Sequence, residues 1–413
     1  MNQMKRAFLI LIILVGAFSF CPATTISASS YCDPDGEQSS GAIYRICMPE
    51  PGNWNGILII YAHGYVPFYE PIQIPDNDLT LPDGTYIPEM LNQLGFAFAV
   101  TSYSTNGLAV RAAVDDIREL AEIFTSKYGE PNQVYLIGGS EGGLITTLAV
   151  EKYPALFDGG LAGCGPIGDF KLQINFIQDF RVVFDYFFPG VIPGSAVDIP
   201  EEVMLGWEEI YKDAVTNAIT SNRSKTDQLF RVTLAATDWG SRESKLETTM
   251  WLMGYNIFAT NDAEEKLGGQ PFDNRWRLYV GSWNDFRLNR KVKRFKADSA
   301  AIHELIAYYQ TSGKLSSELV TMHTTGDPLI PYWHEALYLG KVTSKGSLAH
   351  YVHIPIFRYG HCNFKAYEVL VGLAVLYWKV NGQILPGIEN VIMNDQDLST
   401  YKQMLEGLGI DQP

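Results

Sequence analysis

The sequence predicts an α/β protein with a mostly parallel, doubly wound sheet and a large, mainly helical insertion. Apolar runs of strand length alternate with amphipathic stretches early in the chain, an order that implies parallel strands joined by right-handed crossovers. An aromatic-rich middle part interrupts this alternation, and strand signals return after it. With 413 residues, of which 46% are hydrophobic and 19% charged, the chain can bury a large core, so it is globular and not disordered.

The predicted strands are near-continuous apolar runs, which are typical of strands buried on both faces. They lie at 56–63, 96–100, 134–137 and 159–164 in the first half and at 319–323 and 350–357 in the second. The predicted helices lie at 109–128, 144–153 and 365–380. These elements place a catalytic domain at 31–166 and 318–413, with an inserted helical lid at 167–317, before the strand that bears the candidate acid.

The N-terminus has the features of a secretory signal peptide. Lys5 and Arg6 precede a weakly polar to apolar run over 7–20, and small residues follow it. This run is shorter than the roughly 20 residues of a membrane-spanning helix. We therefore expect residues 1–30 to be removed and the mature protein to be secreted or periplasmic, without a stable membrane anchor. A retained span and a lipid-modified Cys21 are the alternatives.

Four cysteines follow the predicted signal peptide, an even number in a chain bound for an oxidising compartment. Cys32 and Cys47 bracket a turn rich in Gly, Ser and Asp. This arrangement predicts a local disulfide, with two free structural thiols as the alternative. If that bridge forms, Cys164 and Cys362 are left to pair with each other.

Charge and composition argue against several other functions. The formal net charge is −15, and one basic cluster, at 287–296, is flanked by Asp285 and Asp298. Such a cluster is typical of a solvated helix face, so we do not expect nucleic-acid binding. The oxygen-rich stretch 76–83 lacks the glycine and closing glutamate of an EF-hand. We predict no metal and no cofactor.

A Gly-x-Ser-x-Gly motif occupies residues 138–142, between a predicted strand and a predicted helix. In a nucleophile elbow, glycines flank the serine because the sharp turn leaves no room for side chains. The motif alone is only moderately specific, since glycine is abundant in this chain. Its place between strand and helix favours Ser140 as a nucleophile over an idle serine in a glycine-rich turn.

A serine nucleophile needs a base, and the base needs a carboxylate to orient it. Among seven histidines, His361 is the one in a loop after the last predicted strand. Asp327 follows the strand at 319–323 in a Gly-Asp-Pro turn, which places it at the same predicted edge of the sheet. We therefore assign His361 as the base and Asp327 as the acid. The order Ser, Asp, His differs from the orders in chymotrypsin and subtilisin.

An ester or amide hydrolase also needs two backbone donors that stabilise the oxyanion of its tetrahedral intermediate. The N–H of Glu141, directly after the nucleophile, is the first candidate. The second is the N–H of Tyr65, at the end of an early strand, where Gly64 lets the chain turn. We expect His63 to act structurally by fixing that loop. The Glu141 side chain either contacts a cationic substrate or points into solvent.

These motifs together resemble the α/β-hydrolase superfamily over most of the chain outside the insertion. The resemblance implies a Ser-His-Asp serine hydrolase that works through an acyl-enzyme. Cys362 beside His361 is similar to the His-Cys pair of tannase and feruloyl-esterase relatives. Those relatives carry the partner cysteine just before the serine, where this sequence has Gly139. Cys164, just past the next predicted strand, is then the candidate to tie down the histidine loop.

The predicted function is a secreted carboxylic ester hydrolase acting on a small-molecule ester with an apolar or aryl portion. The aromatic residues of the insertion motivate the apolar portion. The alternatives are a serine peptidase resembling prolyl oligopeptidases and aminopeptidases, an acyltransferase, or a non-catalytic binding protein on a hydrolase fold. No propeller repeat is recognisable, which weighs against an oligopeptidase. All three triad residues are present, which weighs against the non-catalytic protein.

Overall fold

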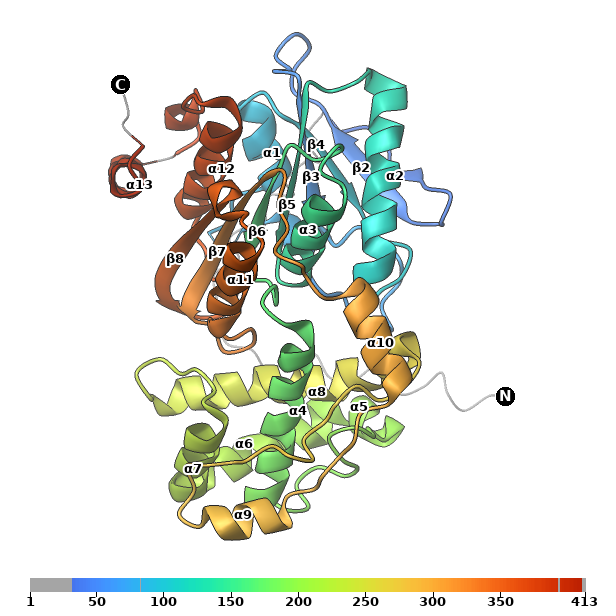
Figure 1. Cartoon of the computed structure of the whole chain (residues 1–413), viewed down its shortest axis with the longest axis vertical. Helices are drawn as coiled ribbons and strands as arrows, with labels where there is room; N and C mark the ends of the chain where they lie inside the picture. The colour runs from blue at the N-terminus through green and yellow to red at the C-terminus, as the bar shows by residue number, and fades with distance from the viewer. Residues whose placement is uncertain (1–31, 82, 393, 411–413) are drawn as a thin grey trace, which may run out of the picture.

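A computed structural model describes residues 32–81, 83–392 and 394–410 of the chain. The predicted signal peptide and Cys21 lie outside the described residues. A sheet with helices on both faces forms one part of the molecule, and a helical insertion forms the other (Figure 1). Within the described ranges, no helix has the length and apolar character needed to cross a membrane.

Eight strands form one sheet in the order β1-β2-β4-β3-β5-β6-β7-β8. The pairs β1–β2 and β2–β4 are antiparallel, and the remaining neighbours are parallel. This arrangement confirms the predicted fold class. The strands are β1 (Gly36–Glu37), β2 (Ile43–Cys47), β3 (Ile57–Ala62), β4 (Ala97–Thr101), β5 (Gln133–Gly139), β6 (Gly159–Gly163), β7 (Glu318–Gly326) and β8 (Tyr351–Tyr359).

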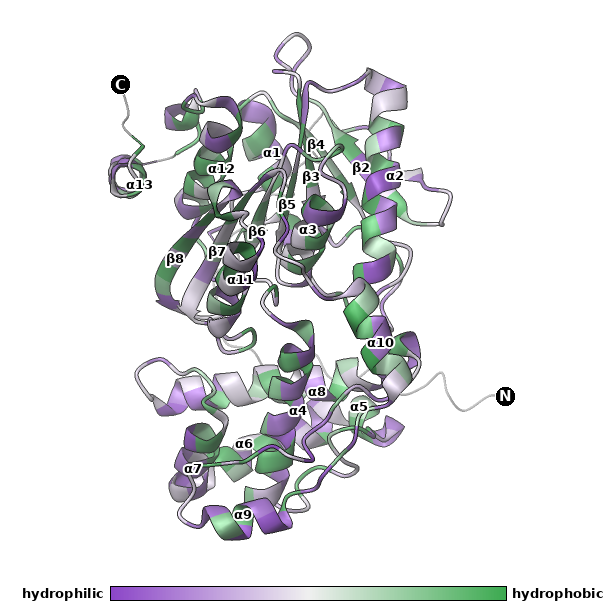
Figure 2. Ribbon diagram, in the orientation of Figure 1, coloured by the Kyte–Doolittle hydropathy of each residue, from purple (hydrophilic) through white to green (hydrophobic). Residues whose placement is uncertain are grey.

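The two faces of the sheet are covered by different helices, each with its own apolar core. One face packs against α2 (Val110–Tyr128), α3 (Glu141–Lys152) and α11 (Trp333–Ser344). The other packs against α1 (Ile87–Gln93), α12 (Ala366–Asn381) and α13 (Asp395–Gly407). Apolar residues predominate in β3, β4 and β5 (Figure 2), and β6 is buried throughout, because strands covered on both sides have few solvent-facing positions.

The insertion joins β6 to β7 and builds a third apolar core. Local signals start its helices; for example, the side chain of Asp169 accepts the N–H of Leu172 at the beginning of α4. Its helices are α4 (Phe170–Phe187), α5 (Glu201–Leu205), a π-helical turn (Trp207–Tyr211), α6 (Lys212–Ser221), α7 (Arg223–Thr233), α8 (Arg242–Leu267), α9 (Asp285–Lys291) and α10 (Ser299–Tyr308).

Apolar packing in both directions holds the insertion against the sheet. Ala301 and Leu305 of α10 join the core on the α2 side of the sheet. In the opposite direction, Leu329 and Ile330, which follow β7, are buried in the core of the insertion. The turn that bears Asp327 is therefore held by both parts of the molecule.

Both proposed cysteine pairs form disulfides. Cys32 and Cys47 join the first described residue to β2. Cys164 and Cys362 connect residues 198 positions apart, one just after β6 and the other just after β8. The second disulfide therefore links the two halves of the sheet on either side of the insertion.

Candidate active site

Ser140 occupies a sharp turn between β5 and α3. Its backbone has φ 57° and ψ −123°, and a positive φ is rare for residues other than glycine. A Cβ atom on Gly138 would lie 2.4 Å from the carbonyl oxygen of Gly142, and one on Gly142 would lie 2.0 Å from that of Ala62. Both glycines of the motif are therefore required by the close approach of neighbouring backbone. The turn exposes the serine at the carboxyl edge of the sheet.

The three residues assigned from the sequence as nucleophile, base and acid meet at this edge. Ser140 Oγ lies 2.8 Å from His361 Nε2, and His361 Nδ1 lies 2.8 Å from Asp327 Oδ2. Because a carboxylate only accepts, Nδ1 carries the hydrogen, which leaves Nε2 to accept from the serine hydroxyl. The arrangement can move a proton from Ser140 to His361.

Asp327 is held in one orientation by the backbone that follows it. Its Oδ1 accepts the N–H groups of Leu329 and Ile330 at 2.9 and 2.8 Å. Burial alone would raise the pKa of Asp327, but His361 and His323 beside it outweigh burial and hold the pKa below its ordinary value. The group is thus an anion whose Oδ2 faces His361.

A buried cation lies behind Asp327. His323 is fully buried on β7, with Nε2 3.6 Å from Asp327 Oδ2 and 2.9 Å from the carbonyl oxygen of Ile330. Its Nδ1 lies 3.0 Å from Glu335 Oε1. Both ring nitrogens face oxygen acceptors, so both carry hydrogens. Burial alone would lower the pKa of His323. The carboxylates of Asp327 and Glu335 outweigh burial and raise the pKa to about 10.

Glu335 balances this cation from α11. Its Oε2 accepts the hydroxyls of Thr321 at 2.8 Å and Tyr351 at 3.1 Å, and it lies 3.1 Å from Nδ1 of His353. Burial would raise the pKa of Glu335, but the bonds from His323 and His353 hold it below the ordinary value. Both histidines lie within strands predicted from the sequence, but this network was not predicted. Histidines within predicted buried strands were the available signal.

The proposed oxyanion donors flank Ser140. A Cβ on Gly64 would lie 3.6 Å from Ser140 Cβ, so the loop that contains Tyr65 passes beside the nucleophile. Glu141 is the first residue of α3, where the N–H groups have no carbonyl one turn earlier to bind. The Tyr65 hydroxyl donates to the Phe258 carbonyl at 3.4 Å. This loop is thereby connected to α8 of the insertion.

The sequence left two options for the side chain of Glu141, which were contact with a cationic substrate and exposure to solvent. The structure excludes exposure to bulk solvent. The side chain is buried, and Oε1 accepts the N–H of Ala109 at 3.0 Å. Burial raises its pKa to about 8, although the bond from Ala109 opposes this shift. The acid is thus mostly protonated near neutral pH.

His63 lies under the same loop. Its ring stacks on Tyr103, with 3.9 Å between ring centroids, and Nδ1 lies 2.7 Å from the carbonyl oxygen of Gly64. Burial lowers its pKa to about 4, so the ring is neutral and Nδ1 donates. These contacts fit the predicted structural role.

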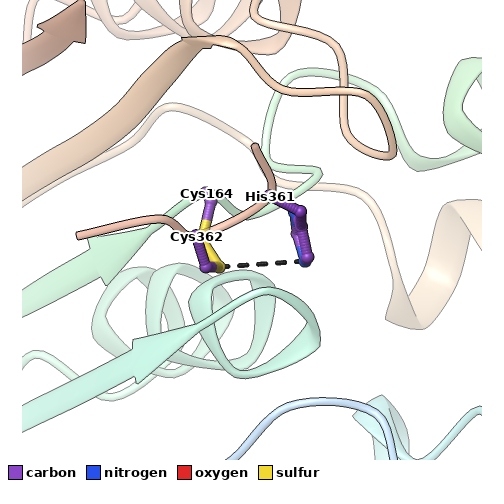
Figure 3. Close-up of side chains that lie close together, drawn as sticks. All are labelled: Cys164, His361 and Cys362. Atoms are coloured by element: carbon purple, nitrogen blue, oxygen red, sulfur yellow. Dashed lines mark hydrogen bonds between the residues drawn. A yellow bond between two sulfur atoms is a disulfide. The ribbon is translucent and has the colours of Figure 1, made fainter. Parts of the chain in front are cut away.

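The second disulfide lies directly against the histidine loop (Figure 3). Cys362 Sγ is 3.8 Å from His361 Nε2. The ligand atoms of Cys164, His361 and Cys362 lie within 4.8 Å of one another, a grouping that would resemble a metal site if the sulfurs were thiolates. Both sulfurs belong to the disulfide, so here they anchor the loop.

A cavity of about 390 Å³ extends from Ser140 and His361 toward α1 and α12. We call it the main cavity. Asn77, Asp78 and Thr80 contribute polar groups to it. Its walls are otherwise mainly apolar and include Ile59, Ile87, Met90, Leu91, Leu161, Met322, Phe364 and Leu373.

A smaller cavity of about 110 Å³ lies on the insertion side of Ser140. Its lining is mainly apolar, with several uncharged polar side chains and two acidic ones, Glu141 and Glu264. Glu264 Oε1 is buried and has no hydrogen-bond partner among the described residues. Burial raises the pKa of Glu264 to about 7. A ligand group that can bond to a carboxyl would complete this site.

Two of the aromatic residues noted in the insertion line the main cavity. These are Trp251 and Tyr255 on α8, and the Trp251 ring lies edge-on to His361 with 6.0 Å between centroids. Phe180 and Phe184 instead fill the insertion core, and Trp239 is fully exposed. The aromatic residues of the insertion thus lie in three places, which are the wall of the main cavity, the core of the insertion and the exposed surface.

The comparisons with known proteins agree with this geometry. Residues 108–254, which include the Ser140 elbow, match the family model described as serine aminopeptidase, S33. This match and the mostly parallel eight-stranded sheet are consistent with the α/β-hydrolase fold. No curated protein matches the sequence significantly.

Solved structures of both esterases and peptidases are similar to this chain. An esterase from Aspergillus oryzae is 15% identical with a TM-score of 0.45, and the match covers 84% of this chain and 78% of that one. Feruloyl esterase B from the same organism is 15% identical with a TM-score of 0.44, over 85% and 81% of the two chains. The acylaminoacyl peptidase of Pyrococcus horikoshii is 11% identical with a TM-score of 0.40; the match covers 81% of this chain but only 38% of the peptidase.

Proposed function

We propose that this hydrolase is a secreted carboxylic ester hydrolase with Ser140, His361 and Asp327 as its catalytic triad. The observation that carries the proposal is the unbroken hydrogen-bonded series from Ser140 Oγ through His361 to Asp327, with 2.8 Å at each step. A nucleophile, a base and an orienting acid within hydrogen-bond reach are the requirements of this chemistry. Two disulfides support the secreted location.

In the proposed mechanism, Ser140 Oγ attacks the ester carbonyl while its proton moves to His361 Nε2. Asp327 stabilises the imidazolium that forms. The N–H groups of Tyr65 and Glu141 bind the oxyanion. His361 then protonates the departing alcohol, which leaves an acyl group on Ser140. Water, deprotonated by His361, attacks this acyl-enzyme and releases the acid.

The main cavity supports an ester with an apolar or aryl portion. It adjoins both Ser140 and His361, and most of its wall is apolar. Cavities of a few hundred Å³ suit small-molecule ligands, and apolar walls favour apolar groups. Trp251 and Tyr255 add aromatic surface at the same place, which suits an aryl group.

The test is turnover of short-chain p-nitrophenyl esters by the mature protein and by Ser140→Ala, together with labelling by a fluorophosphonate. We expect ester cleavage and covalent labelling in the parent, and loss of both in the variant. Absence of Ser140-dependent turnover and of labelling in a folded parent protein would contradict hydrolysis by this site.

The second candidate is an aminopeptidase, which the matched family description favours. Glu264 lines the same smaller cavity as Ser140, and one of its carboxyl oxygens has no hydrogen-bond partner among the described residues. A carboxylate there would attract a substrate ammonium group. Aminoacyl anilides distinguish the candidates. Cleavage of anilides in preference to esters, with a raised KM in Glu264→Gln, would move the assignment to peptidase.

A further inference from the structure

A second surface with unusual chemistry lies on the insertion, apart from the cavities. It comprises residues 275–291, and we name it the tip surface; α9 marks it at the end of the insertion remote from the sheet (Figure 1). Single exposed apolar residues are ordinary, but a dense group of them usually marks an interaction site. Five large apolar side chains are exposed within eleven positions here: Trp276 (88%), Leu278 (78%), Val280 (65%), Trp283 (78%) and Phe286 (78%).

The local backbone directs these side chains outward. Residues 276, 278 and 280 are exposed in alternation with buried Tyr279, whose hydroxyl donates to Asp179 at 2.5 Å. Asn289 of α9 bonds both the N–H and the carbonyl oxygen of Tyr279, at 3.0 and 2.7 Å. Tyr279 and Leu288 belong to the same core. The segment before α9 and the helix are thus fixed side by side, with their exposed side chains on the side away from that core.

Basic groups accompany the apolar ones. Arg287, Arg290 and Lys291 are exposed on α9, and none of them has a carboxylate within ion-pair distance in the part of the chain that the structure describes. The neighbouring Asp285 accepts from the backbone of Gly281 and Ser282. In Figure 2, α9 shows both hydrophilic and hydrophobic residues. The tip surface is therefore locally basic in a chain of net charge −15.

We propose that the tip surface binds membranes that contain anionic lipids. A lipid interface accepts both kinds of side chain, because apolar groups enter the acyl boundary while cations remain among negatively charged headgroups. Tryptophan favours this boundary, since its ring is apolar and its N–H is polar. A soluble polyanion would pair with the cations but leave five apolar side chains in water. An apolar protein surface would leave the cations without partners.

The test is co-sedimentation of the mature protein with vesicles of phosphatidylcholine alone or of phosphatidylcholine mixed with phosphatidylglycerol. We expect binding to the anionic vesicles that weakens as salt increases. Each basic residue near an anionic surface contributes about fivefold in affinity. The charge variant Arg287→Gln/Arg290→Gln/Lys291→Gln should therefore bind on the order of 100-fold more weakly. The apolar variant Trp276→Ser/Trp283→Ser/Phe286→Ser should also lose binding, because insertion needs those side chains.

Matched substitutions on the catalytic domain provide the controls. Lys345→Gln/Lys402→Gln removes exposed charges, and Phe357→Ser removes an exposed aromatic ring; both should bind vesicles like the parent. Circular dichroism checks the fold of every variant. Absence of parent binding to anionic vesicles would overturn the proposal. Binding that depends on the charges but not on the apolar side chains would also overturn it, in favour of polyanion binding. A parent dimer that the apolar variant dissociates, without vesicle binding, would assign the surface to a second copy of this chain.

Discussion

The carboxyl edge of the sheet and the helical insertion use charge in opposite ways. At the sheet edge, Asp327, His323 and Glu335 are buried, and each lies against a partner of opposite charge. On the tip surface, Arg287 and Arg290 are exposed, and neither has such a partner among the described residues. Buried charges require fixed partners, whereas exposed charges remain available to ligands. Substitutions at the sheet edge should therefore affect chemistry and stability, and substitutions in the insertion should affect binding.

The largest effect is expected for Asp327→Asn. An amide keeps the shape of the side chain but cannot stabilise the imidazolium of His361, so kcat for a p-nitrophenyl ester should fall by about 10⁴. Steady-state kinetics measure this loss, and circular dichroism should show an intact fold. A kcat within tenfold of the parent value would argue against Asp327 as the acid.

The next effect concerns stability. Glu335→Ala removes one of the two counter-charges of His323 and leaves this buried cation with Asp327 alone, which should lower the free energy of unfolding by about 3–5 kcal/mol. Urea unfolding measures this change. His323→Gln/Glu335→Gln removes both charges and should be more stable than Glu335→Ala. Equal stability of the two variants would indicate that His323 is not charged in the folded protein.

Much of the sheet could be predicted from sequence because its strands are continuous apolar runs. The runs before the insertion lie within a residue or two of β3, β4, β5 and β6. Helices α11 and α13 were not predicted. α11 begins at Trp333, close behind Pro331, where turn residues obscure the pattern. α13 carries few apolar positions, with Tyr401 and Leu405 as its buried residues.

The candidate site also contains residues that could be located from the sequence and residues that could not. Ser140 could be located because its turn requires glycines, and these leave a visible motif. The network of His323, Glu335 and His353 could not be located from the sequence. Its members come from β7, α11 and β8 and meet only after the strands pair. The cavities likewise depend on how separate elements pack, which no local pattern records.

A smaller effect is expected for the disulfide that anchors the histidine loop. Cys164→Ser/Cys362→Ser should lower the free energy of unfolding by about 2–4 kcal/mol, because the bond restricts an unfolded chain over a long separation. Cys32→Ser/Cys47→Ser, across 15 residues, serves as the comparison and should cost less. Thermal and urea unfolding measure both. If Cys32→Ser/Cys47→Ser lowers the free energy of unfolding more than Cys164→Ser/Cys362→Ser does, the length of the closed loop does not determine which disulfide stabilises more.

The pH dependence of stability tests Glu141, at the junction of the two regions. Its ordinary pKa is 4.5, and its folded pKa is about 8. Between these values the unfolded chain loses the proton while the folded chain keeps it, so the free energy of unfolding falls as pH rises. The fall should be about 1.4 kcal/mol for each pH unit between these values and should level off above about pH 8. Subtracting the curve of Glu141→Gln isolates this contribution, and parallel curves would contradict it.

The smallest effect is expected in the insertion, for Trp251→Ala. Its ring lines the main cavity and contacts His361 edge-on, so removal should raise KM for an aryl ester by roughly tenfold and change kcat less. Trp239→Ala is the matched control, because that ring is fully exposed in the loop before α8. If Trp251→Ala instead lowers kcat with KM unchanged, the ring acts by positioning His361, and the division between a chemical sheet edge and a binding insertion fails at this residue.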